Sequence, residues 1–254
     1  MASSIITTPS RAAGKAAPTW QQATLTDVID EAPDAVTLRL QLEESGGFLP
    51  GQYYNVRLKV GEHQRPVQRA YSVGSSPAPD PSVIDLGVRE VPGGLLSPRL
   101  VKLHTGQCLD VRGPYGRFTW TAEDPAPVLL VGAGSGLVPL MSMIRHAVQR
   151  GRSDPVWLIC SAATYDHAFY RDELADLAGR HRWLRLVHCI TRDPAERRAD
   201  YHQRVDRAVL SEFLGEARPA RAYLCGPPAM VESVAAALVG LGVSPAVIAT
   251  EKYD

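Results

Sequence analysis

The sequence predicts two domains: an antiparallel β-barrel of Greek-key type, followed by an α/β domain with a parallel sheet. Three observations support this fold class. The 254 residues suffice for two domains of about 100–130 residues each. Residues 19–121 show short alternating apolar runs between Gly and Pro turns, and later residues alternate between strand and helix patterns. We therefore expect a disordered tail over residues 1–18, a barrel over 19–123 and an α/β domain over 124–254.

The predicted tail is rich in Ala, Ser and Thr and contains Arg11 and Lys15 but no acidic residue. A cleaved organellar presequence has this composition too. Because no convincing amphipathic helix is present, the sequence favours a disordered tail.

The barrel prediction depends on strand patterns and on what separates them. Apolar and polar residues alternate over 35–42 and over 53–60, and Gly46-Gly47 and Pro50-Gly51 provide turns. Several short strands with regular turns are typical of a barrel or sandwich. Residues 113–118 are expected to form a turn that closes the barrel.

After residue 124 the pattern changes to strands that alternate with helices, which is typical of a parallel sheet covered on both faces. Strands are expected at 128–131, 156–160, 184–190, 222–225 and 246–250, and helices at 137–150, 166–179, 205–214 and 227–241.

Charge and cysteine content exclude several functions. Lys plus Arg equals Asp plus Glu at 27 each, so no whole-chain charge attracts nucleic acid or anionic membrane. The four cysteines lie far apart without a C-x-x-C pair, which argues against a metal site and is typical of reduced thiols in the cytoplasm. No apolar run is long enough to span a bilayer.

Residues 131–139, Val-Gly-Ala-Gly-Ser-Gly-Leu-Val-Pro, form the most informative motif. A strand, a glycine-rich turn and a helix start create a site for a phosphate. The G-x-G-x-x-G fingerprint is not met, because Leu137 takes the position of its third glycine. Ser135 also lacks the flanking glycines of a G-x-S-x-G nucleophile elbow. A tight turn without ligand is the alternative.

Two segments of the barrel have a composition that suits a flavin nucleotide. In Arg69-Ala70-Tyr71-Ser72, an arginine can pair with phosphate, a tyrosine can cover a ring and a serine can hydrogen-bond a ring nitrogen. Taken alone, the segment is better explained as a half-exposed strand. The loop around Gly94 and Ser97 is either a second phosphate cradle or a helix N-cap at Ser97.

Cys225 lies where a predicted strand meets the start of a helix, in Leu-Cys-Gly-Pro-Pro-Ala-Met over residues 224–230. The helix dipole can favour a reactive thiolate there. A small polarisable group beside a substrate ring and an ordinary core cysteine are the alternatives.

The order and spacing of these motifs resemble the ferredoxin–NADP⁺ reductase family, in particular its bacterial oxygenase-reductase and flavin-reductase branch. The motifs are R-x-Y-S, G-G-x-x-S, G-P-Y-G-x-F, G-x-G-x-x-x-P and C-G-P-P-x-M, followed by a terminal Glu-Lys-Tyr-Asp. The resemblance covers about residues 19–254. None of these motifs belongs to the iron–sulfur domain that is fused to some relatives.

The resemblance implies roles for individual residues. Ser72, Cys225 and Glu251 would lie at the reacting rings, with Ser72 near the flavin N5. The residues expected to bind FAD are Arg69, Ala70, Tyr71, Ser72, Val88, Gly94, Leu95, Leu96, Ser97 and Tyr253. Those expected to bind NADPH are Gly134, Ser135, Gly136, Ser161, Thr191, Arg192, Tyr201, Arg204, Cys225, Gly226, Pro227 and Met230.

The resemblance further implies that electrons pass from NADPH through FAD to a ferredoxin or oxygenase component. A reductase of free flavin or quinone is an alternative, and a non-catalytic FAD-binding regulatory subunit is another. NADPH is expected over NADH because Thr191 and Arg192 match the family's 2′-phosphate-reading pair. Tyr201 and Arg204 resemble the adenine-covering tyrosine and the second cation of NADP-specific relatives. Ala163 departs from the pattern, since relatives often carry Arg there.

Overall fold

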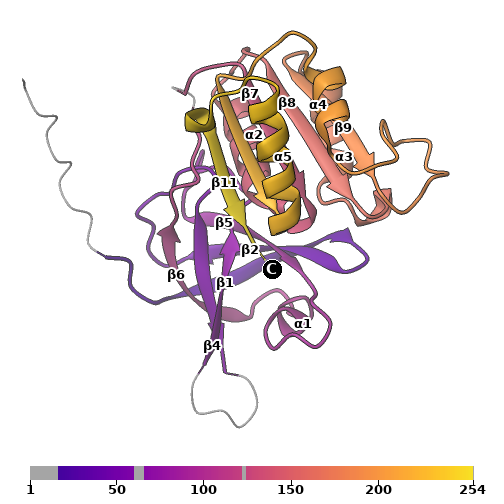
Figure 1. Ribbon diagram of the computed structural model, residues 1–254. Helices are drawn as coiled ribbons and strands as arrows, with labels where there is room; N and C mark the ends of the chain where they lie inside the picture. The colour runs from indigo at the N-terminus through magenta and orange to yellow at the C-terminus, as the bar shows by residue number, and fades with distance from the viewer. Residues whose placement is uncertain (1–16, 60–65, 122–123, 254) are drawn as a thin grey trace, which may run out of the picture.

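The computed structural model describes residues 17–59, 66–121 and 124–253. These residues form two sheets, one antiparallel and one parallel, that lie one above the other in Figure 1. None of the helices in the described ranges combines the length and apolar character that crossing a bilayer requires.

The first sheet has six strands in the order β4-β3-β6-β1-β2-β5. Alternate residues of its strands face a shared core that includes Leu38, Leu40 and Leu86. An isolated bridge between Val73 and Leu86 joins the two edge strands, so the sheet curls into a barrel. Its elements are β1 (Gln21–Ala32), β2 (Ala35–Leu42), β3 (Tyr53–Leu58), β4 (Val67–Ser72), β5 (Val83–Arg89), β6 (Cys108–Tyr115) and the short helix α1 (Ser97–Leu100).

The second sheet is parallel, with the order β11-β10-β7-β8-β9. Its strands are β7 (Val128–Ala133), β8 (Val156–Ala162), β9 (Leu184–Ile190), β10 (Arg221–Gly226) and β11 (Ile248–Lys252). The helices are α2 (Leu137–Gln149), α3 (Arg171–Arg180), α4 (Arg207–Leu214) and α5 (Pro228–Gly240).

Helices cover both faces of this sheet. Val128 and Leu130 of β7 pack with α2 and α3, whereas Leu129 and Val131 pack with α4 and α5 on the opposite face. Strands buried on both faces have continuous apolar sequences, which explains the run at 128–131. The predicted fold class, a barrel followed by an α/β domain, is confirmed.

Some element boundaries differ from the predictions. Helix α3 begins at Arg171 instead of residue 166, because Tyr170 adopts a left-handed conformation with φ 57° that an α-helix does not accommodate. The last strand begins at Ile248, because Pro245 first opens a 3₁₀ turn. Strand β6 continues to Tyr115, so the predicted turn over 113–118 is partly strand. Residues 1–16 of the tail predicted over 1–18, and residues 122–123 at the predicted domain boundary, lie outside the described residues.

Candidate flavin and nucleotide site

The predicted turns meet at the carboxyl edge of the parallel sheet, between β7 and β10. Strand order reverses there, because β8 and β9 extend from β7 on one side and β10 and β11 lie on the other. Open α/β sheets bind their ligands at such a switch point. The glycine turn at η1 (Gly134–Gly136) follows β7, and Pro227 follows β10 at the start of α5.

Two glycines of this turn are required by geometry. Gly134 has φ +55°, which favours glycine. A Cβ atom on Gly136 would overlap the backbone carbonyl of Cys225. The turn therefore brings the start of α2 against the end of β10 and leaves its backbone close to the cavities beside it.

The first of these cavities lies between the barrel and the glycine turn and has a volume of about 430 Å³. Eight residues predicted from the sequence line it: Arg69, Ala70, Tyr71, Ser72, Ser135, Cys225, Glu251 and Tyr253. Five others that the sequence analysis missed complete its wall: Tyr53, Gly87, Arg89, Val138 and Lys252. We call this space the flavin cavity, because its donors suit a flavin ring.

The polar groups of the flavin cavity are arranged to receive a ligand. Arg69 is exposed, and no carboxylate of the described residues pairs with it. Burial raises the pKa of Tyr71 to about 12, so its hydroxyl stays protonated. Burial also raises the pKa of the Glu251 carboxyl, and its Oε2 atom is buried without a hydrogen-bond partner among the described residues. A buried orphan oxygen needs a partner from a ligand, water or proton.

The Cys225 side chain is buried at the end of β10. It is 2 % exposed, and burial together with the neighbouring Glu251 raises the pKa of the thiol well above its ordinary value. These effects oppose the thiolate that proximity to a helix start can favour. Of the alternatives from the sequence, the structure favours a neutral thiol, and the role of Cys225 beside a substrate ring remains a prediction.

Tyr253 ties the C-terminal segment to the glycine turn. Its hydroxyl donates to the carbonyl of Ala133 and accepts a hydrogen bond of 3.0 Å from the amide of Gly136. Tyr253 thus lines the flavin cavity next to the glycine turn.

A second cavity of about 370 Å³ lies beyond this turn, over the ends of β7, β8 and β9 and the start of α5. We call it the nucleotide cavity. Predicted residues that line it are Gly134, Ser161, Thr191, Arg204, Pro227 and Met230. Arg89 of the barrel lines both cavities.

Arg89 is the most important residue that the sequence analysis missed. Its Nη2 donates to the carbonyl of His167 (2.5 Å), its Nε lies 3.4 Å from a carboxylate oxygen of Asp34, and its guanidinium lies over the Phe169 ring. The available signal was strand alternation: Val88 is fully buried in the barrel core, so its neighbour on β5 faces outward.

Nine predicted residues do not line either cavity. The Val88 side chain belongs to the barrel core, and its predicted contact with FAD remains a prediction. Ser97 accepts a hydrogen bond from the amide of Val91 (3.0 Å), and Leu96 is the N-cap residue of α1; the predicted cap at Ser97 is therefore wrong. The nine are Val88, Gly94, Leu95, Leu96, Ser97, Gly136, Arg192, Tyr201 and Gly226.

Arg192 and Tyr201 lie near the nucleotide cavity but outside its wall. Arg192 is exposed, and its backbone amide donates to the carbonyl of Ala163 (2.8 Å). Tyr201 packs partly against the core beneath α4 and α5. Their predicted roles in nucleotide binding remain predictions.

The residues present fit a flavin and a nicotinamide nucleotide. The orphan oxygen of Glu251 and the guanidinium of Arg69, whose hydrogen bond in the described residues goes to the carbonyl of Gln68, provide complementary groups in the flavin cavity. The glycine turn directly precedes the first residue of α2. Backbone amides and the helix dipole at a helix start favour the binding of phosphate. When bound, FAD supplies the capacity to accept a hydride and pass electrons onward.

Comparison with known proteins agrees with these assignments. Residues 22–120 match the model of the oxidoreductase FAD-binding domain, and residues 130–236 match the oxidoreductase NAD-binding domain. The chain is 34 % identical over 212 residues to ferredoxin–NADP reductase B of Sorangium cellulosum, covering 82 % of this chain and 86 % of that protein.

Two further relatives show the range of proteins that share this unit. The chain is 31 % identical over 226 residues to the ferredoxin–NAD(P)⁺ reductase component of the naphthalene 1,2-dioxygenase system of Pseudomonas putida, covering 87 % of this chain and 65 % of that protein. The crystal structure of the Amycolatopsis cytochrome P450 reductase GcoB is 30 % identical with a TM-score of 0.79, covering 96 % of this chain and 73 % of that one. The chain thus spans less than two thirds of the length of the Pseudomonas relative. With both domains matched in order, the chain belongs to the ferredoxin–NADP⁺ reductase family of FAD-dependent NAD(P)H oxidoreductases.

Proposed function

We propose that this chain takes electrons from NADPH through FAD and delivers them to a ferredoxin or an oxygenase component. The observation that carries the proposal is the common wall of the two cavities. Arg89 lines both, and the glycine turn contributes Ser135 to the flavin cavity and Gly134 to the nucleotide cavity. A nucleotide that spans this wall would bring its nicotinamide beside the flavin ring, as hydride transfer requires.

Within this proposal, the residues of the flavin cavity have distinct tasks. Ser72 donates a hydrogen bond near the reacting flavin nitrogen, and Tyr71 covers the ring. Cys225, as a neutral thiol, packs beside the nicotinamide without placing a charge there. Glu251 holds or relays a proton at its buried carboxyl, consistent with its raised pKa.

The preference for NADPH over NADH is proposed from the composition of the nucleotide cavity. Thr191 and Arg204 line it, and no acidic residue is part of its wall. A carboxylate that binds the ribose diol would repel a 2′-phosphate, whereas arginine binds phosphate through charge-assisted hydrogen bonds.

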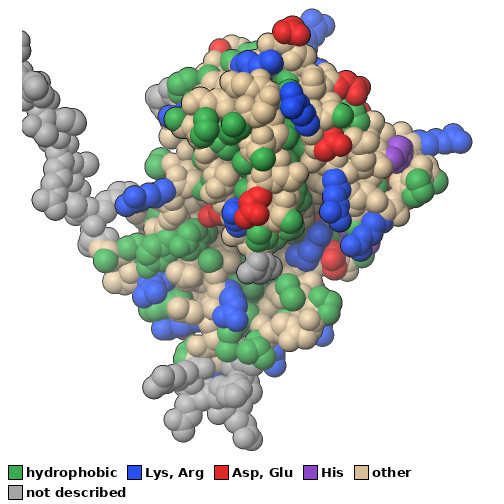
Figure 2. Space-filling model, viewed as in Figure 1, with side chains coloured by type: hydrophobic (Ala, Val, Ile, Leu, Met, Phe, Trp, Pro, Cys, Tyr) green, Lys and Arg blue, Asp and Glu red, His purple; other side chains and the backbone are tan. Residues whose placement is uncertain are grey.

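An oxygenase-type electron acceptor is proposed from the relatives. In Figure 2, Lys and Arg side chains lie over both domains on the visible face, so charge on this face does not single out one docking surface. Two relatives named above are a reductase component of a dioxygenase system and a cytochrome P450 reductase, which supports an oxygenase-type acceptor.

The experiment that tests the proposal begins with the purified protein. We expect it to be yellow, to release FAD and not FMN on denaturation, and to be bleached by NADPH under anaerobic conditions with a higher kcat/KM than by NADH. Chromatography of the released cofactor and an anaerobic titration from 350 to 500 nm measure these outcomes. A flavin that neither nucleotide reduces would indicate the regulatory-subunit alternative. Rapid turnover with free flavin or quinone and none with iron–sulfur proteins would indicate the reductase alternative.

A further inference from the structure

A cavity of about 830 Å³ lies between the barrel and the helices α2 and α3. Charged residues of both domains line it, including Arg39, Asp85, Arg145 and Glu173. These groups bind one another instead of pointing free charges into the space. Because they satisfy each other, the cluster is better explained as a joint between the domains than as a ligand site.

Arg145 of α2 is the centre of this joint. Its Nε and Nη2 atoms donate to the two carboxylate oxygens of Glu173 on α3, at 2.9 and 2.6 Å. Its Nη1 atom donates across the domain interface to the carbonyl of Gly74 (2.8 Å) and lies 3.4 Å from Asp85. The side chain of Arg145 is 19 % exposed and that of Asp85 is 4 % exposed, so both charges are largely removed from water.

The barrel partners of Arg145 are fixed in turn. Asp85 accepts hydrogen bonds from Nε and Nη2 of Arg39, at 2.8 and 3.0 Å. The amide of Gly74 donates to the backbone carbonyl of Asp85 (2.7 Å), and Ser142 of α2 donates to the carbonyl of Ser75 (2.6 Å). The guanidinium of Arg145 is thus bound to backbone that follows β4 directly.

This backbone continues into the wall of the flavin cavity. Gly74 follows Ser72 by two residues, and Gly87 follows Asp85 by two residues; Ser72 and Gly87 both line the cavity. Arg145 itself does not line it. A shift of Arg145 can therefore reach the flavin cavity through the β4 and β5 backbone.

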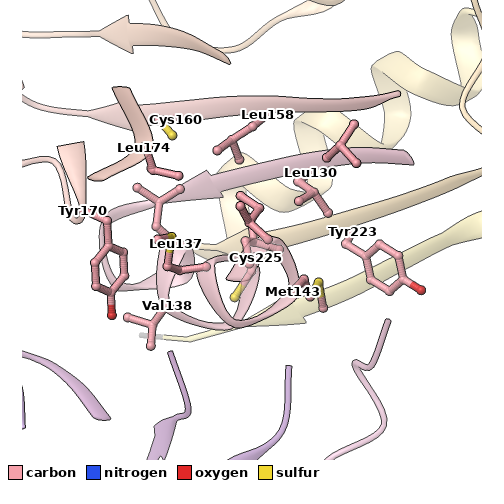
Figure 3. Packing of buried hydrophobic residues seen from close by; sticks show 14 of the residues in the cluster. Leu130, Leu137, Val138, Met143, Leu158, Cys160, Tyr170, Leu174, Tyr223 and Cys225 are labelled. Atoms are coloured by element: carbon pink, nitrogen blue, oxygen red, sulfur yellow. The ribbon is translucent and has the colours of Figure 1, made fainter. Parts of the chain in front are cut away.

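The two domains are closely packed at Gly74 and Gly87. A Cβ atom on Gly74 would lie 2.7 Å from the hydroxyl of Tyr170, and one on Gly87 would lie 3.1 Å from the same hydroxyl and overlap Val138. Figure 3 shows Tyr170 and Val138 pointing away from the parallel sheet toward the barrel strands. The backbone of the flavin cavity thus rests directly on side chains of the α/β domain.

Helix α2 connects the glycine turn to the interdomain contacts of Arg145. Its first turn follows Ser135, which lines the flavin cavity beside the glycine turn. Arg145 lies eight residues after Leu137, or about 12 Å along the helix axis. The same helix therefore holds the glycine turn at one end and, through Arg145, the backbone at Gly74 that follows the flavin cavity residue Ser72.

We propose that Arg145, through Gly74, Asp85 and Glu173, is a positioning residue that sets the distance between the nicotinamide and the flavin for hydride transfer. This inference rests on the proposed electron transfer from NAD(P)H to FAD. Misplacement by about 1 Å can slow a reaction by about 100-fold, so loss of the joint is expected to lower kcat and to spare binding of either cofactor.

The test compares Arg145→Gln and Arg145→Lys with Arg180→Gln in the FAD-loaded protein. Arg180 is a matched control, because its ion pair with Asp176 is exposed and lies within α3. We expect Arg145→Gln to slow flavin reduction about 10- to 100-fold at saturating NADPH, with FAD content and the Kd for NADP⁺ changed less than about 2-fold. Arg145→Lys should recover part of the rate, because it retains the charge but not the two-pronged contact with Glu173.

A second readout does not depend on activity. Hydrogen exchange of backbone amides near Gly74 and Gly87 should accelerate in Arg145→Gln and stay at the wild-type rate in Arg180→Gln, because only the former loses interdomain hydrogen bonds. If Arg145→Gln fails to fold, Arg145→Lys carries both measurements.

Three outcomes would overturn the proposal. Wild-type reduction rates in both Arg145 variants would show that the joint does not position the cofactors. Equal losses in kcat and in NADP⁺ binding would indicate general damage to the fold. Unchanged hydrogen exchange would show that Arg145 does not hold the backbone near Gly74 and Gly87. If instead the wild-type protein is not reduced by NADPH or NADH, the proposed function itself fails.

Discussion

Removing Arg204 should selectively weaken the use of NADPH. Arg204 lines the nucleotide cavity together with Thr191 and Ser161, whereas Arg192 lies outside its wall. The sequence alone treated both arginines as phosphate-reading candidates, and the cavity favours Arg204. A hydrogen bond to a charged group contributes about 1.5–3 kcal/mol, which corresponds to about 10- to 150-fold in kcat/KM. Because Arg204 is exposed, solvent screening favours the lower part of this range.

The assay measures kcat/KM for NADPH and for NADH in the wild type, in Arg204→Ala and in Arg192→Ala. We expect Arg204→Ala to lose efficiency with NADPH and to keep it with NADH, because only NADPH carries the 2′-phosphate. Arg192→Ala should have a smaller effect on NADPH. Equal losses with both nucleotides in Arg204→Ala, or a wild type that already prefers NADH, would refute the reasoning.

Two further predictions concern stability. Gly136→Ala should lower Tm by about 2–12 °C, because an added Cβ overlaps the Cys225 backbone and overpacking costs about 1–3 kcal/mol; an unchanged Tm by calorimetry would contradict it. Glu251→Gln should flatten the pH dependence of unfolding in FAD-free protein. Burial raises the folded-state pKa of Glu251 above 4.5, so its contribution to stability is greatest at low pH and is lost as pH rises through the folded-state pKa. Denaturant titrations at several pH values should therefore show the variant gaining relative to wild type as pH rises; parallel curves would exclude this contribution.

The strand pattern of the sequence predicted most of the fold, because period-2 alternation and buried apolar runs are local signals. Strand β9 and strand β2 begin and end at the predicted residues. The boundaries that failed depend on long-range contacts. Tyr170 interrupts the predicted helix because its amide donates to Glu31 of the barrel (3.3 Å) and its hydroxyl packs against Gly74 and Gly87, contacts that the local sequence does not encode.

The site residues that belong to a sequence motif were predictable. Those that only the packing of the two domains brings into the site were not. The R-x-Y-S segment and the glycine turn were recognised from residue types and spacing, and their residues line the two cavities. Arg89 and Tyr53 belong to none of the motifs quoted from the sequence. They line the flavin cavity because β3 and β5 meet α2 there, which only the packing of two domains determines.

Arg89 shows why the two cavities form one functional unit. It belongs to the barrel by sequence, yet its guanidinium lies over Phe169 of the α/β domain and donates to the carbonyl of His167. Its position on the wall common to both cavities places a positive charge where a nucleotide phosphate would pass from one cavity to the other. A bound nucleotide would therefore touch both domains at once, and its binding energy would hold them together. Arg145 fixes the same two domains on their other side through Gly74 and Asp85. The contact through the nucleotide forms only when ligand is bound, whereas the contact through Arg145 is present without it. The domains therefore keep a defined orientation before the nucleotide arrives, and binding energy need not be spent on assembling the site.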